Sequence, residues 1–247
     1  MHYKYTIHQS HQDKKKYLIH IKDYFNKANT TIHKARNELK VIPYNDIEVV
    51  VKSFQVPNLI NQIAYSLLRD SKAKKAYDNA LKIGNFTPKP IGYIEFYNGF
   101  LLKESYFLAE NFQYDFTIRE PLLDANFNDA QEIFRAFARF TLKLHNNGIF
   151  HNDYSPGNIL IKKENGNYIF KIVDINRMKF INLTLNDRAR NFSKLWAHDY
   201  ILEIIADEYQ KHYTCSDDFK NKVLYYSNKN KKVKNFKKRL KGKPVND

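Results

Sequence analysis

The decisive stretch of this 247-residue sequence is His151-Asn152-Asp153-Tyr154-Ser155-Pro156-Gly157-Asn158-Ile159-Leu160-Ile161, followed by Phe170-Lys171-Ile172-Val173-Asp174. Asn158 comes five residues after Asp153, and Asp174 ends an apolar run. One aspartate can deprotonate a hydroxyl, while an asparagine and a second aspartate supply the hard oxygen ligands that Mg²⁺ prefers. The spacing predicts a phosphotransfer site, with Asp153 as catalytic base and Asn158 and Asp174 as ligands of Mg²⁺ on a nucleotide triphosphate. We expect His151 to shape this loop by packing and hydrogen bonding.

Helical and strand-like patterns surround this stretch. Apolar residues recur at helical spacing over 129–146, and Asn147-Gly148 ends that pattern. Two short strands are predicted at 158–162 and 168–173, joined by the turn at 164–167. From about Asp187 onward the pattern is helical. The motif therefore lies on a loop between a helix and a hairpin.

The first half of the chain is richer in strand signals. Segment 47–56 is β-branched and apolar, so it predicts a buried strand that carries Lys52 as the phosphate-binding lysine. A helix is predicted at roughly 58–82, where Asp78 is the candidate acid to pair with Lys52. Strands at 91–97 and 101–109 are joined by Asn98-Gly99, a strong hairpin signal.

The order of these elements predicts an α+β, two-lobed protein-kinase-like fold in a single kinase-like domain. The expected N-lobe spans 1–112, the C-lobe spans 113–228, and a basic tail spans 229–247. A ligand is expected in the crevice between the two lobes. Backbone groups from Glu110 to Phe112, after the last N-lobe strand, are expected to read the adenine edge of ATP.

Four segments together resemble the lipopolysaccharide kinase family, which includes Kdo kinases and core-heptose kinases. They are Lys52, the Ser-Lys-Ala-x-x-x-Tyr-x-Asn-Ala stretch that begins at Ser71, the His-x-Asp-x-x-x-x-Asn motif, and Asp174-Ile-Asn-Arg-Met-Lys-Phe180. The resemblance runs from about residue 37 to residue 196. It implies ATP and Mg²⁺ as cofactors, and transfer of the γ-phosphate to a sugar hydroxyl of the lipopolysaccharide inner core. By position, it implies that Asp153 is the base, Asn158 and Asp174 bind the metal, and Lys52 and Asp78 belong to the ATP site.

The sequence departs from protein kinases in two places. Residues 26–46, before Lys52, contain no glycine, so a turn that covers phosphates there would use other backbone N–H groups or basic side chains. The segment between Asp174 and the helix near Asp187 is too short for a peptide-docking activation loop, which argues against a protein substrate. Its basic residues are candidates to clamp an anionic acceptor; they are Arg177, Lys179, Arg188 and Arg190.

The composition suits an anionic partner. The formal net charge is +15 and the isoelectric point is about 9.6. An A/T-rich codon bias would also enrich Lys, Asn, Ile, Tyr and Phe, but it explains less well the cluster from Lys229 to Lys243, which has no acidic residue. We expect an anionic glycolipid acceptor, and a tail that is solvated or lies against the inner membrane surface. One cysteine, no signal-peptide pattern and no apolar run of membrane-spanning length predict a cytoplasmic protein, peripheral at that membrane.

Other functions are compatible with the same motif. A small atypical Ser/Thr protein kinase, such as the one associated with tRNA modification, and an antibiotic phosphotransferase also use Asp-x-x-x-x-Asn and a later Asp. A peptide platform would favour the first, and an acidic pocket for a cationic antibiotic would favour the second. A pseudokinase or nucleic-acid-binding module is the non-enzymatic alternative, in which the basic tail grips phosphates. The filled catalytic positions argue against it and disfavour nucleic acid as a partner.

Overall fold

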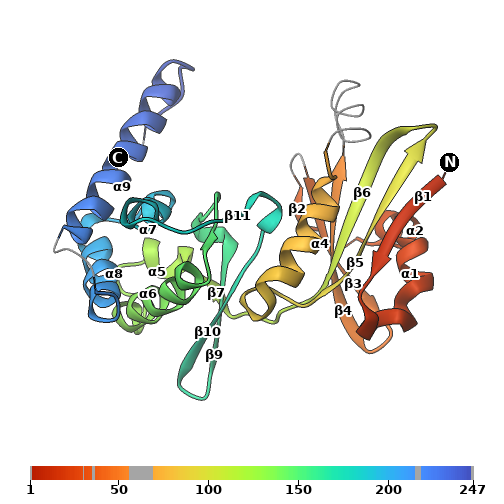
Figure 1. The fold of residues 1–247 in the computed structure, drawn as a ribbon, viewed down its shortest axis with the longest axis horizontal. Coiled ribbons are helices and arrows are strands. Elements are labelled where there is room, and N and C mark those ends of the chain that lie inside the picture. Colours follow the sequence, from red (N-terminus) through yellow and green to blue (C-terminus); the bar gives the residue numbers. More distant parts are fainter. Residues whose placement is uncertain (1, 30, 35–36, 56–68, 215–217, 246–247) are drawn as a thin grey trace. The chain divides into compact units, whose positions relative to one another are not determined.

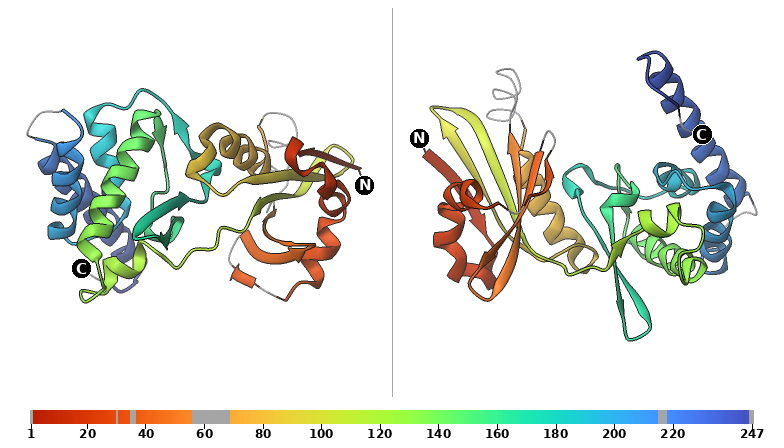
Figure 2. Two further views of the ribbon diagram at one scale, coloured as in Figure 1. Left: turned by 90° about the horizontal axis from the view of Figure 1, so that it is seen from below. Right: turned by 180° about the vertical axis from the view of Figure 1, so that it is seen from behind.

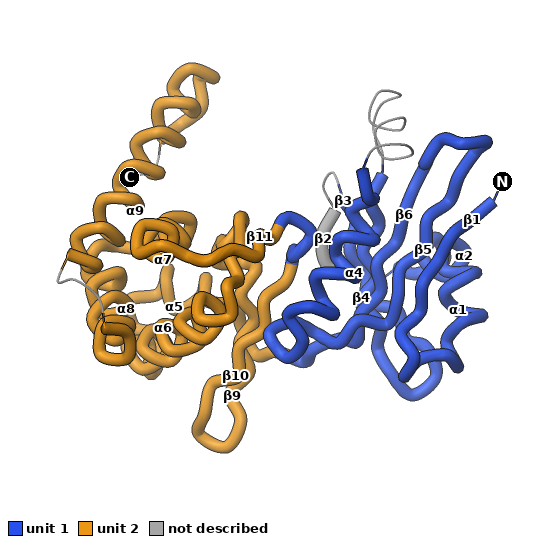
Figure 3. Tube along the Cα trace, viewed as in Figure 1, with its two compact units in different colours: residues 1–113, 174–177 blue, residues 114–173, 178–247 orange. Residues whose placement is uncertain are grey.

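The computed structural model describes residues 2–29, 31–34, 37–55, 69–214 and 218–245. The chain forms two compact units, coloured separately in Figure 3. Unit 1 comprises residues 1–113 and 174–177, and unit 2 comprises residues 114–173 and 178–247. Each unit is described by itself below.

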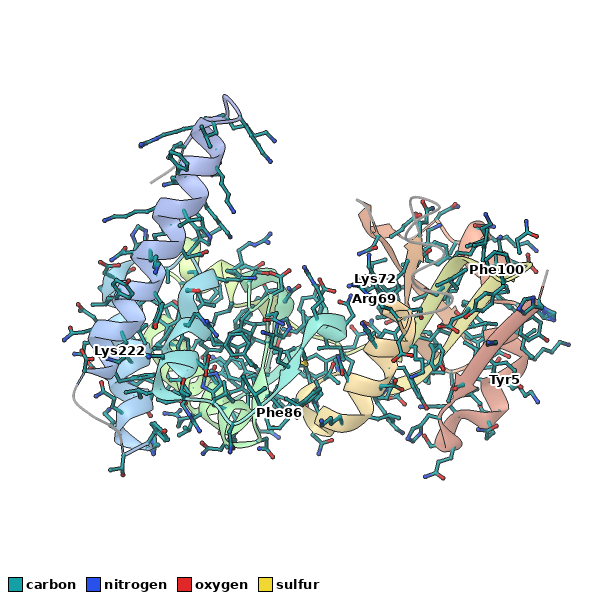
Figure 4. All side chains as sticks on the ribbon, turned by 45° about the horizontal axis from the view of Figure 1, so that its top comes forward. Tyr5, Arg69, Lys72, Phe86, Phe100 and Lys222 are labelled. Atoms are coloured by element: carbon teal, nitrogen blue, oxygen red, sulfur yellow. The ribbon has the colours of Figure 1, made fainter. Side chains whose placement is uncertain are left out.

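Unit 1 is built on an antiparallel six-stranded sheet with the order β1-β5-β6-β4-β3-β2 (Figure 1). Its strands are β1 (His2–Ile7), β2 (Thr31–Lys34), β3 (Asn37–Tyr44), β4 (Ile47–Gln55), β5 (Pro90–Asn98) and β6 (Leu101–Glu110). Its helical elements are η1 (Gln9–Lys14), α1 (Lys15–Ile19), α2 (Ile21–Lys27), α4 (Lys72–Ile83), η2 (Gly84–Phe86) and η4 (Ile175–Arg177). Phe100, at the exposed turn between β5 and β6, is labelled in Figure 4.

Helices cover both faces of this sheet (Figures 1 and 2). Side chains of α1 and α2 pack with Val49 and Val51 of β4 in the larger apolar cluster. On the other face, Phe54 of β4 packs with Ala73 and Tyr77 of α4. Because successive side chains of a strand alternate between faces, Lys52 lies on the same face of β4 as Phe54, the face covered by α4.

The described strands of unit 1 agree with the sequence at its strongest signals. The strand at 47–56 and the hairpin at 91–97 and 101–109 are confirmed as β4, β5 and β6; residue 56 lies outside the described residues. No element was predicted for the segments of β1, α1 and α2, and residues 1–17 are polar.

The predicted helix at 58–82 is wrong in its extent. Residues 58–68 lie outside the described residues, but residues 69–71 are not helical, and α4 begins at Lys72. The Ser71 side chain accepts a hydrogen bond from the Lys74 N–H at 3.0 Å. This N-cap satisfies one of the backbone N–H groups that the first turn of a helix leaves unpaired. The serine therefore marks the start of α4, which the spacing of apolar residues does not reveal.

Unit 2 is mainly helical. Its helical elements are α5 (Arg119–Leu123), α6 (Ala130–Asn146), η3 (Pro156–Asn158), α7 (Leu185–Asn191), η5 (Phe192–Lys194), α8 (Asp199–Lys211) and α9 (Phe219–Arg239). Its strands are β7 (Phe116–Thr117), β8 (Ile149–Phe150), β9 (Ile159–Glu164), β10 (Asn167–Ile172) and β11 (Lys179–Phe180). These strands form the sheets β10-β9-β7 and β11-β8. The predicted helix at 129–146 and the predicted hairpin are confirmed as α6 and as β9 with β10.

Helix α9 contains most of the segment that the sequence assigned to a basic tail. Residues 229–239 are its second half, and its first half is anchored by the buried side chains of Phe219, Val223 and Ser227. Within the described residues, no helix is both long enough and apolar enough to cross a membrane.

Candidate active site

Asp153 lies in a loop of unit 2 between β8 and η3, and hydrogen bonds hold its backbone. Its carbonyl accepts hydrogen bonds from the Ser155 N–H at 2.8 Å and from the Asn158 side-chain amide at 2.9 Å. The Asp153 side chain is 30% exposed, and its Oδ1 lies 3.7 Å from Nζ of Lys194. The main chain is thus fixed while the carboxylate keeps access to solvent, as a catalytic base requires.

His151 fixes the same loop through both ring nitrogens. Its Nε2 lies 2.9 Å from the Val173 carbonyl, and its Nδ1 accepts the Asp153 N–H at 3.0 Å. A carbonyl can only accept, so Nε2 carries the proton and the imidazole is neutral. The structural role expected of His151 is confirmed.

A series of buried hydrogen bonds supports the loop through the His151 carbonyl, and the donor of each bond can be assigned. The Asn191 Nδ2 donates to the His151 carbonyl at 2.9 Å, so its Oδ1 accepts from His145 Nε2 at 3.0 Å. The other ring nitrogen of His145 accepts from the Tyr209 hydroxyl at 2.8 Å, and that hydroxyl accepts from Arg188 at 2.8 Å. Burial lowers the pKa of His145 to about 4, so the neutral ring required by this chain is the stable form at neutral pH.

Tyr154 anchors the loop to α6. It is fully buried, and its hydroxyl lies 2.9 Å from Oγ1 of Thr141. Thr141 donates its own proton to the Phe137 carbonyl, so Tyr154 is the donor. The residue after the candidate base is therefore held by both packing and a hydrogen bond.

Two hydrogen bonds fix the orientation of the Asn158 side chain. Its Nδ2 donates to the Asp153 carbonyl and to the Ser155 hydroxyl at 3.1 Å, so Oδ1 is the atom that would meet a cation. The Val173 N–H donates to the Asn158 carbonyl at 3.0 Å, and Asp174 is the next residue in the chain. Amide and carboxylate oxygens fit Mg²⁺, which takes few protein ligands together with phosphate oxygens and water. Across the described residues no cluster of three or more His, Cys, Asp or Glu is placed to hold a metal ion.

Lys52 and Asp174 meet in unit 1, although 122 residues separate them in sequence. Nζ of Lys52 lies 2.6 Å from Oδ1 of Asp174, and both side chains are largely buried. The Asn79 side chain of α4 donates to the Ile175 carbonyl at 2.7 Å and so fixes the segment after Asp174. Asp174 has a φ of 57°, in the left-handed region that aspartate tolerates better than most residues. The predicted phosphate-binding lysine and one predicted metal ligand are thus neighbours.

The ion pair between Lys52 and Asp78 expected from the sequence is not the pair that the structure has. Asp78 accepts from Lys74, one turn earlier on α4, at 2.7 Å, and its side chain is 47% exposed. Asn79, the next residue, faces the Asp174 segment instead. One residue along a helix turns the side-chain direction by roughly 100°, so a one-position difference changes which residue faces the site.

The predicted adenine-reading segment follows β6 directly. The Glu110 N–H donates to the Lys89 carbonyl at 2.9 Å, and the Asn111 N–H donates to the Glu48 carbonyl at 2.9 Å. The Glu110 carboxylate lies 3.1 Å from His11. Since these two amides are used within unit 1, adenine recognition by Glu110 and Phe112 would depend on other backbone groups of the segment, and it stays a prediction.

The four basic residues expected to clamp an anionic acceptor do not form one group in the structure. Arg188 is buried, donates to Tyr209 and to Asn146, and lies over the Tyr213 ring, so it belongs to the core. Arg190 pairs with Asp187 at 2.6 Å. Sequence reasoning missed Lys194 instead, whose Nζ lies near the Asp153 carboxylate and donates to the Asn152 carbonyl. No local sequence signal singles it out, because the contact spans 41 residues.

Together these features define a kinase-like fold, in which a β-rich lobe carries Lys52 and a helical lobe carries the loop of Asp153 and Asn158. A solved structure of WaaP in complex with acyl carrier protein matches the chain with a TM-score of 0.62. The match covers 93% of this chain and 99% of that chain at 11% sequence identity, so the likeness is one of fold. No family model and no curated protein sequence matches the chain.

Proposed function

We propose that this protein is an ATP- and Mg²⁺-dependent kinase that transfers the γ-phosphate to a sugar hydroxyl of the lipopolysaccharide inner core. The observation that carries the proposal is the hydrogen-bonded loop of Asp153 and Asn158, on a fold shared with WaaP over nearly the whole length of both chains. The resemblance of four sequence segments to the lipopolysaccharide kinase family supports the same class of acceptor.

The residues divide the chemistry among them. Asp153 would accept the proton of the attacking hydroxyl, because its carboxylate is accessible while its backbone is fixed. Lys52 would neutralise phosphate oxygens of ATP. Asn158 and Asp174 would hold Mg²⁺, which when bound offsets the charge of the phosphate chain.

A sugar acceptor is favoured over a protein by the chain between Asp174 and α7. Residues 175–184 hold only the short elements η4 and β11, which leaves little room for a peptide platform. The net charge of +15 favours an anionic glycolipid over a cationic antibiotic.

The test is transfer of labelled phosphate from ATP to Kdo-bearing lipid A precursors, compared with aminoglycosides and with a generic protein. We expect Mg²⁺-dependent labelling of the glycolipid alone, lost in Asp153→Asn and kept in Asp23→Asn, a matched change at an exposed residue of α2. Preferred labelling of the protein or of the antibiotic would assign one of the alternative acceptors. Salt-sensitive RNA binding without Mg-ATP binding would support the non-enzymatic alternative.

A further inference from the structure

Helix α9 turns one face toward residues 193–197, at the end of η5 and just after it. At roughly 100° per residue, six positions from Val223 onward fall on one stripe; they are Val223, Ser227, Asn230, Lys231, Lys234 and Lys238. The first two are fully buried. The Asn230 side chain donates to the Ser193 carbonyl at 2.7 Å, and Lys231 donates to the Ala197 carbonyl at 2.8 Å. The stripe therefore clamps residues 193–197.

The last two positions of the stripe place cations around the only tryptophan of the sequence. Nζ of Lys234 lies 5.1 Å from the centre of the Trp196 ring, and Nζ of Lys238 lies 5.6 Å from it. Trp196 has a φ of 58°, a left-handed conformation that is unusual for so bulky a residue and is typical of functional sites. The half-buried ring thus has two ammonium groups of α9 within cation–π distance.

Charges link Lys234 of this pair to the candidate base. Lys194, two residues before Trp196, has its Nζ 3.7 Å from Asp153 Oδ1. Partial desolvation and the charges of Lys194 and Lys238 lower the pKa of Lys234, while Asp153 opposes that shift. Lys194 thus lies against the Asp153 carboxylate, Lys234 is within electrostatic range of both, and Lys238 is within range of Lys234. Among the described residues, the ion pairs of α9 involve Lys220, Lys222 and Lys231 rather than Lys234 or Lys238; Figure 4 labels Lys222 on this helix.

We propose that Lys234 and Lys238, together with the Trp196 face, bind a phosphate group of the glycan acceptor and so bring its hydroxyl to Asp153. This inference rests on the proposed function, and it names the part of the acceptor that is recognised. Ammonium groups bind phosphate as point charges, and the tryptophan face can cover the apolar side of a sugar ring. Lys194, already bonded to the Asn152 carbonyl, is the positioning residue for Asp153.

Because Trp196 is the only tryptophan, its fluorescence reports binding at this cluster in the 247-residue chain. The probe is the deacylated, bisphosphorylated Kdo-bearing disaccharide, titrated beside its phosphatase-treated form, inorganic phosphate and an RNA oligonucleotide of equal charge. We expect the phosphorylated glycan to change the emission of the wild type, and Lys234→Gln/Lys238→Gln to bind about tenfold more weakly. The charge-matched control is Lys232→Gln/Arg239→Gln on the opposite face of α9, and it should bind like the wild type. Circular dichroism confirms that each variant is folded.

Any of the following results would overturn the inference: no response of the wild type, equal weakening in both double variants, equal affinity for the phosphatase-treated glycan, or tighter binding of RNA with the same dependence on Lys234 and Lys238. Inorganic phosphate alone should bind more weakly than the glycan, and equal affinity would also overturn it. A wild type that binds the phosphorylated glycan but transfers no phosphate would refute the proposed function and leave the binding site standing.

Discussion

Acid should destabilise unit 2 through one buried side chain, His145. The ring is 1% exposed, and both of its nitrogens are engaged in the chain that ends at the His151 carbonyl. A second proton would have to sit on Nδ1, which accepts from the Tyr209 hydroxyl, in the field of Arg188. Folding therefore selects the neutral ring, and burial lowers the pKa of His145 from 6.5 to about 4.

The sign and size of the effect follow from proton linkage. The unfolded chain takes up the proton first as the pH falls, so stability is lost between about pH 6.5 and pH 4 and is then level. Between pH 7 and pH 4.5 this single group should lower the free energy of unfolding by about 2.5 kcal/mol, from 1.36 kcal/mol for each unit of pKa.

Urea unfolding followed by Trp196 fluorescence measures this loss within unit 2. Wild type and His145→Gln should differ in the pH dependence of the unfolding free energy by about 2.5 kcal/mol, whatever their stabilities at pH 7. His198→Gln, which changes an exposed histidine of the same unit, should keep the dependence of the wild type. If His145→Gln loses as much stability on acidification as the wild type, the assigned hydrogen-bond chain is wrong.

Three further predictions concern the site and its frame. Asp153→Asn should keep the fold and nucleotide binding but lower turnover by about 10²–10⁴-fold, and near-full activity in a phosphate-transfer assay would contradict its role as base. Asp174→Ala should abolish the Mg²⁺-dependent thermal stabilisation by ATP, whereas Asp78→Asn, which removes only an exposed i,i+4 pair with Lys74, should keep it; the reverse outcome would restore Asp78 to the site. Ser71→Ala should lower the free energy of unfolding of unit 1 by about 1 kcal/mol through loss of the α4 N-cap, measured by urea unfolding, and an unchanged midpoint would rule out that cap.

The parts of the site that the sequence predicts are those set by local chain geometry. Asp153 and Asn158 lie on one loop, so their spacing is sufficient to bring them together, and the Asn158 amide bonds the Asp153 carbonyl directly. Lys52 is placed by strand alternation, since a period of two puts it on the face of Phe54. The hairpin of β5 and β6 follows from Asn98-Gly99, which favours the turn.

The partners of these residues depend on contacts far apart in sequence. Nothing near Lys52 indicates that its partner is Asp174, because that pair depends on how α4 and η4 pack in unit 1. The choice between Asp78 and Asn79 is a matter of helix rotation, and the packing of Ala73, Ala76 and Ala80 decides it. Alanine differs little in hydrophobicity from the residues around it, so the spacing of apolar residues does not show which side of α4 is buried.

Helix α9 shows where composition stops being informative. An A/T-rich codon bias can raise the number of lysines in a segment, but it does not determine on which side of a helix those lysines lie. On α9 the residues that make contacts lie on one side of the helix. Val223 and Ser227 are buried, Asn230 and Lys231 donate hydrogen bonds to residues 193 and 197, and two further lysines lie over Trp196. The lysines of the opposite face share the composition but make none of these contacts. Charge-matched variants on the two faces therefore separate the number of basic residues from their placement, and only placement can account for a difference between them.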